Sequence, residues 1–129
     1  MSEMYTERLL DHYRNPRNRG RLDAPDLAAE EYNPLCGDRV RIEMCTEAGR
    51  IIEARFEGRG CALCLGAASI LTEIIRGRSL DELRTFDQGE FLAQLQSKPR
   101  PSRLKCALLP WMAFRHAAYG ESEWSLLEP

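Results

Sequence analysis

The chain has 129 residues, which is enough for one domain with one hydrophobic core, and we expect residues 1–129 to form that domain. Hydrophobic residues make up 43% and charged residues 29%, an ordinary balance for a globular protein. The formal net charge of -2 argues against a nucleic-acid-binding protein, which usually presents a strongly basic face. No apolar run approaches the roughly 20 residues of a membrane-spanning helix. The acidic N-terminus lacks a signal-peptide pattern, so we expect a cytoplasmic protein without membrane contact.

The N-terminal part predicts one helix followed by irregular chain. Ser2 can cap a helix over residues 2–13, whose apolar side chains recur at helical spacing. The helix should end before Pro16, because the residue that precedes a proline is pushed out of the α region. Residues 14–21 contain four arginines and form either a solvated loop or a docking surface for an acidic partner. We expect residues 23–35 to be irregular.

A β-hairpin is predicted next. Apolar and polar side chains alternate over residues 40–45 and again over residues 52–57, which is typical of half-buried strands. The connection contains Gly49, which a tight turn favours. We expect a third short strand to end near Cys61.

The second half of the chain predicts helices. Residues 63–76 have the apolar spacing of a largely buried helix, and Gly77 is placed to end it. A last helix is expected over residues 107–119, with Pro110 in its first turn, where a missing amide hydrogen costs little. Cys106 would then lie at or just before the start of this helix.

Two shorter helices are predicted between these long ones. Ser79 with Glu82, and Asp87 with Glu90, have the spacing of capping boxes that open helices. Strands followed by helices, without alternation between them, predict an α+β domain in which helices cover a small antiparallel sheet.

The cysteines are the residues most indicative of function. Disulfides are rare in the cytoplasm, so the five cysteines favour metal ligands, a reactive thiol or buried thiols. Cys36, Asp38, Cys61 and Cys106 all lie at the ends of predicted elements, two of them where helix N-termini would favour a thiolate. Three thiolates and a carboxylate can form a tetrahedral site for zinc or an iron–sulfur cluster. The alternative is that these cysteines only fill small apolar gaps.

Other candidate ligands give weaker signals. Cys45 falls on the polar side of a strand, where we expect no role. Cys64 follows Cys61 at the spacing of a redox pair, but a thiol in the core of the helix is the favoured interpretation. His12 and His116 lie at helical spacing and are interpreted as partly buried surface residues, not ligands.

Several segments together identify a family. They are Asp11–Gly20, Asn33–Asp38, Gly58–Cys61, Ala68–Ser69 and Leu104–Cys106. In these segments, which span nearly the whole chain, the sequence resembles the U-type iron–sulfur scaffold family. That family includes the IscU and SufU proteins and the N-terminal domain of NifU.

The resemblance implies a three-stranded antiparallel sheet packed against several helices, and a site at one exposed end formed by Cys36, Asp38, Cys61 and Cys106. Such a site holds zinc or transiently hosts a [2Fe–2S] cluster. Sulfur would arrive as a persulfide from a pyridoxal-phosphate-dependent cysteine desulfurase, with Cys36 or Cys106 as acceptor. The finished cluster would pass to apo iron–sulfur proteins or carrier proteins. The resemblance thus implies a scaffold and not an enzyme, acting as a monomer or weak homo-oligomer.

A second hypothesis is a zinc-dependent sulfurtransferase partner, which stimulates the desulfurase and passes sulfur on without hosting a cluster. Cys36 would be the acceptor in that case, and Cys106 in the scaffold. Lys105 stands where IscU-type chains have a histidine, as in SufU-type chains, and its charge can offset the negative site. Residues 100–104 differ from the IscU-type chaperone-recognition motif, which puts dependence on an Hsp70-type chaperone in doubt. The insertion usual in SufU-type chains is absent, so the sequence lies between the two subtypes. A purely structural zinc domain is disfavoured, because Asp38 would be a weak ligand.

Overall fold

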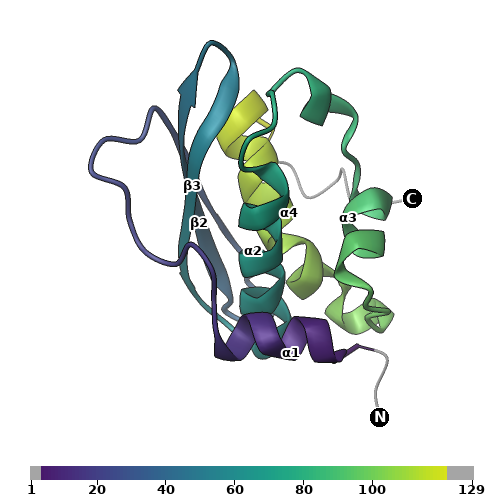
Figure 1. Cartoon of the computed structure of the whole chain (residues 1–129). Helices are drawn as coiled ribbons and strands as arrows, with labels where there is room; N and C mark the ends of the chain where they lie inside the picture. The colour runs from purple at the N-terminus through teal and green to yellow at the C-terminus, as the bar shows by residue number, and fades with distance from the viewer. Residues whose placement is uncertain (1–3, 122–129) are drawn as a thin grey trace.

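The computed structural model describes residues 4–121, in which helices lie on one side of a three-stranded antiparallel sheet (Figure 1). The strands are β1 (Leu27–Tyr32), β2 (Arg39–Glu47) and β3 (Arg50–Arg59), in the order β1-β2-β3. The helices are α1 (Glu7–Arg14), α2 (Ala62–Ile75), α3 (Gln88–Leu95) and α4 (Leu104–Tyr119), with short 3₁₀ turns η1 (Glu82–Thr85) and η2 (Pro101–Arg103). The α+β class and the three-stranded antiparallel sheet are confirmed.

The hairpin of β2 and β3 is longer than its sequence pattern indicated. Its two-residue turn is Ala48-Gly49, and both residues have positive φ, 53° and 77°, as a tight hairpin turn of primed type requires. The strand register shifts between Cys45 and Thr46. This irregularity interrupts the alternation of apolar and polar side chains around Ile52.

The third strand was predicted in the wrong place. It is β1, in the segment expected to be irregular, and it pairs antiparallel with β2. The inward positions of β1 include Ala29 and Glu31, and Glu31 is buried against His116 of α4, with 2.8 Å between Oε2 and Nδ1. Because Glu31 is a charged residue at an inward position, the alternation of apolar and polar residues is interrupted, and the sequence pattern did not reveal the strand.

Helix α1 begins later than predicted. Its cap is Thr6, whose Oγ1 accepts a hydrogen bond from the Leu9 amide at 3.2 Å; Ser2, the predicted cap, lies outside the described residues. The helix ends at Arg14, as the following Asn15-Pro16 indicated.

The loop after α1 is pinned to α2 before it crosses the outer face of the sheet. The Arg17 amide donates to Ser69 Oγ at 2.8 Å, and His12 Nδ1 lies 2.8 Å from the same hydroxyl. Further along, the Leu22 amide donates to the buried Glu43 carboxylate at 2.7 Å. In Figure 1 this loop lies on the side of the sheet opposite the helices.

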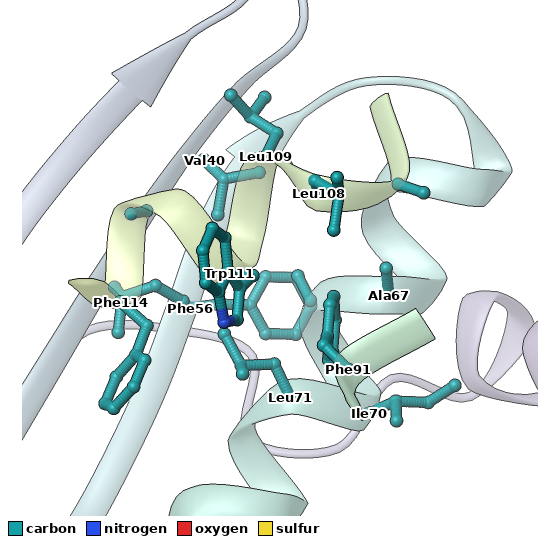
Figure 2. Close-up of a cluster of buried hydrophobic side chains, with 14 of the residues drawn as sticks. Val40, Phe56, Ala67, Ile70, Leu71, Phe91, Leu108, Leu109, Trp111 and Phe114 are labelled. Atoms are coloured by element: carbon teal, nitrogen blue, oxygen red, sulfur yellow. The ribbon is translucent and has the colours of Figure 1, made fainter. Parts of the chain in front are cut away.

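Helix α2 is the centre of the molecule and ends as predicted, with Gly77 at a φ of 83° just beyond it. It lies between the sheet and α1, and the close approach of α1 depends on a glycine. A Cβ at Gly66 would lie 2.8 Å from the backbone oxygen of Leu9. Figure 2 shows the core around α2, where side chains of the sheet, α2, α3 and α4 meet.

Helix α4 begins at Leu104, not at residue 107, because η2 leads directly into it. Cys106 therefore lies within the first turn, and Pro110 lies inside the helix and not in its first turn. Pro110 has no amide hydrogen to donate to the carbonyl of Cys106, four residues earlier. That carbonyl consequently lacks its α-helical hydrogen bond.

Both predicted capping boxes are confirmed. Ser79 and Glu82 exchange hydrogen bonds of 2.9 and 3.0 Å, although they open the 3₁₀ turn η1 and not an α-helix. Asp87 and Glu90 exchange hydrogen bonds of 2.9 and 3.3 Å and open α3. Among residues 4–121, no helix has both the length and the apolar character needed to cross a membrane.

Candidate metal centre

Four predicted site residues come together at the end of the sheet where β2 begins and β3 ends. Asp38 directly precedes β2, Cys61 is the N-cap of α2, Cys106 lies in the first turn of α4, and Cys36 is in the loop before β2. One donor atom each of Cys36, Asp38 and Cys106 lies within 4.8 Å of the other two. Residues up to 70 positions apart in the chain thus share one small volume.

The distances form two pairs. The sulfurs of Cys36 and Cys106 are 3.6 Å apart, and the sulfur of Cys61 lies 3.6 Å from Oδ2 of Asp38. Cys61 lies outside the group of three but contacts it through Asp38. Two thiolates bound to one tetrahedral zinc at about 2.3 Å are about 3.8 Å apart. The separation of the first pair fits such a centre, and the donor set suits zinc or iron–sulfur chemistry.

The loop that presents Cys36 is organised by Asn33. The backbone oxygen of Asn33 accepts from the amides of Cys36 and Gly37, at 3.3 and 2.8 Å, and its amide donates to the Asp38 oxygen at 2.8 Å. Gly37 has a φ of 78°, a conformation that favours glycine. The side chain of Asn33 is buried, and its Nδ2 lies 4.0 Å from the sulfur of Cys106. Asn33 therefore links the loop to α4.

The carboxylate of Asp38 occupies space that a glycine leaves free. A Cβ at Gly60 would lie 2.9 Å from Cγ of Asp38 and 3.2 Å from each of its oxygens. The bend before Cys61 therefore requires glycine because of this contact and not because of backbone freedom.

The thiols differ sharply in access. Cys36 is exposed and Cys61 half-buried, whereas Cys106 is 3% exposed. Burial raises the pKa of the Cys106 thiol to about 12, although a hydrogen bond from the Arg103 guanidinium favours its thiolate. Cys36 is thus the thiol that another molecule can reach.

Arg103 belongs to the candidate site and was not predicted from the sequence. Its Nη2 donates to the sulfur of Cys61 at 2.8 Å. The pKa of its guanidinium is raised, first by a side-chain hydrogen bond with Cys106 and also by Cys61. The sequence pointed to the charge of Lys105 instead. An arginine at the N-cap of the helix that presents a predicted ligand could have been the signal.

The remaining cysteines do not belong to the ligand group. Cys64 is fully buried in the hydrophobic core, as expected. Its pKa is raised well above the ordinary value, mainly by burial and then by the charge of Asp38, so a thiolate is disfavoured there. Cys45 is half-buried, with its sulfur 3.6 Å from the Ala24 carbonyl oxygen on the outer side of the sheet.

The two histidines are also separate from the ligand group. His12 is buried against Ser69, and His116 pairs with Glu31. Both join helices to neighbouring elements, and His12, at 4% exposure, is more buried than predicted.

The fold and this site define a known class of protein. The chain belongs to the NifU-like N-terminal domain family, whose model matches residues 4–121.

Individual relatives agree with that membership. The chain is 31% identical over 130 residues to the zinc-dependent sulfurtransferase SufU of Bacillus subtilis, which covers 88% of each chain. It is 34% identical over 117 residues to the iron–sulfur cluster assembly scaffold protein IscU of Azotobacter vinelandii, covering 88% of this chain and 90% of IscU. A crystal structure described as a SUF-system scaffold protein from Fervidobacterium islandicum AW-1 superposes with a TM-score of 0.77 at 25% identity. The superposition covers 89% of this chain and 96% of that one.

Proposed function

We propose that the protein is an iron–sulfur cluster assembly scaffold. It binds zinc or iron through Cys36, Asp38, Cys61 and Cys106 and transiently hosts a [2Fe–2S] cluster, which then passes to apo-proteins. The observation that supports this proposal most directly is the convergence of the donor atoms of Cys36, Asp38 and Cys106 within 4.8 Å, with Cys61 against Asp38. Relatives named as scaffolds, at over 30% identity, support it independently.

Sulfur would enter this site through Cys36. In the proposed step the Cys36 thiolate attacks the outer sulfur of a persulfide on a pyridoxal-phosphate-dependent cysteine desulfurase. A new S–S bond forms at Cys36, the S–S bond of the donor breaks, and the donor cysteine leaves as a thiolate. The exposure of Cys36 favours it over the alternative acceptor, Cys106, which is buried.

A zinc-dependent sulfurtransferase that hosts no cluster is the second candidate. It is favoured by the same exposed thiol, which can leave a metal without moving a helix, and by the similarity to the Bacillus subtilis SufU. In that case zinc would remain on Asp38, Cys61 and Cys106 while Cys36 accepts sulfur.

Anaerobic purification followed by measurement of zinc, iron and acid-labile sulfide separates the two functions. For the scaffold, desulfurase, cysteine and ferrous iron should give a [2Fe–2S] absorption spectrum, which is lost in Cys36→Ala, Cys61→Ala and Cys106→Ala. Cys45→Ala is the matched control and should retain it. Tight zinc binding with no cluster under any of these conditions would favour the sulfurtransferase.

Persulfide trapping tests the acceptor directly. Incubation with the persulfide-loaded desulfurase, followed by alkylation and mass spectrometry, should label Cys36 in the unmodified protein and in Cys106→Ala. A persulfide found on Cys106 and retained in Cys36→Ala would assign the acceptor role to Cys106.

A further inference from the structure

Three exposed side chains form a row across the outer face of the sheet. Tyr32 of β1 pairs with Arg39 of β2, and Arg39 pairs with Arg59 of β3. Directly paired residues of neighbouring strands point to the same face, so these three side chains lie side by side. Tyr32 is 53% exposed, and both arginines are exposed. We call Tyr32, Arg39 and Arg59 the basic row.

The basic row borders the candidate metal centre. Arg39 directly follows Asp38, and Arg59 is separated from Cys61 only by Gly60. Tyr32 directly precedes the loop that presents Cys36. A protein that reaches the exposed Cys36 thiol would therefore pass close to this row.

The charge of the basic row is poorly compensated within the molecule. Among residues 4–121, the side chain of Arg39 reaches only Glu30, at 3.9 Å, and the side chain of Arg59 forms no hydrogen bond or ion pair. Like charges directly opposite one another on a sheet are destabilising. Placing Arg39 opposite Arg59 therefore lowers the stability of the fold, and the two side chains form no contact that offsets this loss within the pair.

Other arginines near this face are paired with carboxylates. Arg41 and Arg21 both donate to Glu43, at 2.8 and 2.7 Å, and Arg19 donates to Glu57 at 3.3 Å. Arg19 and Arg21 belong to the loop of residues 14–21. Arg17 of the same loop is also paired, with its Nη2 2.7 Å from Oδ2 of Asp11. The sequence allowed this loop to be a docking surface for an acidic partner. Most of its arginines, however, form ion pairs within the molecule.

We propose that the basic row docks an acidic segment of the protein that delivers sulfur to Cys36. Each guanidinium can bind a carboxylate through two parallel hydrogen bonds, and the ring of Tyr32 offers an apolar surface beside them. Two arginines are too few for a nucleic acid, which requires a broad basic face. The proposal rests on the sulfur-acceptor function proposed above.

The test compares two double variants that carry the same change of charge. Arg39→Glu/Arg59→Glu reverses the basic row, and Arg50→Glu/Arg78→Glu reverses two exposed arginines at the hairpin end of the sheet. The probe is the cysteine desulfurase of the same organism, loaded with persulfide, and the readouts are its dissociation constant and the salt dependence of that constant. The row variant should bind roughly tenfold more weakly with a shallower salt dependence, whereas the control should stay within about twofold.

Equal affinity and equal salt dependence in the two variants would overturn the proposal. If the row variant does not fold, as judged by circular dichroism, Arg39→Gln/Arg59→Gln replaces it and should show the same direction of change. Chemical loading with ferric iron and sulfide, without the desulfurase, is unaffected by docking and should be the same in all variants. Failure of that loading in the unmodified protein would count against the scaffold function, and not against docking at the basic row.

Discussion

The guanidinium of Arg103 lies 2.8 Å from the sulfur of Cys61, which is 42 residues earlier in the chain. Since Cys106 also raises the pKa of the Arg103 guanidinium, one cation interacts with two of the candidate ligands. Its positive charge compensates part of the negative charge that the site would carry with its thiolates bound to a metal.

Replacement of Arg103 by methionine should therefore weaken zinc binding by about tenfold, because charge-assisted hydrogen bonds to the thiolates are lost. Competition with a chromogenic chelator measures the effect. Arg103→Lys keeps the charge but not the fork of donors. Its zinc affinity should lie between those of the unmodified protein and of Arg103→Met. Arg100→Met, three residues away and exposed, is the control; an equal loss there would show that general charge, not this contact, matters.

Gly60→Ala should reduce metal content while leaving the fold intact. The new Cβ would stand 2.9 Å from Cγ of Asp38, so the carboxylate must move away from Cys61. Zinc and iron per chain, measured after purification, should fall well below those of the unmodified protein. Gly89→Ala in α3 meets only an Asp87 oxygen at 3.4 Å and should retain its metal. Full metal content in Gly60→Ala would show that Asp38 is not a ligand.

Gly66→Ala tests the packing of α1 on α2. Its Cβ would lie 2.8 Å from the backbone oxygen of Leu9, which cannot rotate away as a side chain could. We expect the free energy of unfolding to fall by about 1–3 kcal/mol, as for other overpacked sites. Urea denaturation provides the measurement, and Gly89→Ala is again the reference. Stability equal to that of the reference would mean that α1 shifts without cost.

Acid should destabilise the protein in part through His12. Burial, followed by the charge of Arg17, holds the pKa of His12 below its ordinary value of 6.5. The unfolded chain therefore takes up the proton first as pH falls, and stability decreases from about pH 6.5 down to the lower pKa of the folded state. His12→Asn should lose less stability than the unmodified protein between about pH 7.5 and about pH 5. An identical loss in both proteins would exclude this origin.

The fold class followed from local patterns, because the strand and helix periods are strong in β2, β3 and α2. Strand β1 was not predicted, since Glu31 occupies one of its inward positions and is stabilised there by His116, a contact that exists only in the folded protein. The start of α4 was misplaced by three residues. The missing amide of Pro110 suggested a helix start, yet the buried packing of α4 tolerates the proline in its interior.

The site was predictable to the extent that its residues lie at the ends of elements. The positions of Cys36, Asp38, Cys61 and Cys106 beside helix and strand ends, together with the family resemblance, selected the four side chains that the fold brings together. Asn33 and Arg103 contribute through contacts across the fold, 73 and 42 residues away in the chain. No local spacing encodes such contacts, so only the structure reveals them.

Pro110 has a mechanical consequence for this site. In an uninterrupted helix, swinging the first turn of α4 outward would break the hydrogen bond between the amide of residue 110 and the carbonyl of Cys106. Here that bond does not exist in any conformation, because proline has no amide hydrogen. Bending α4 at Pro110 to move the turn that bears Arg103 and Cys106 therefore breaks one backbone hydrogen bond fewer than it would in an uninterrupted helix. The thiol of Cys106 and the guanidinium of Arg103 would then move together, away from Cys36 and Cys61.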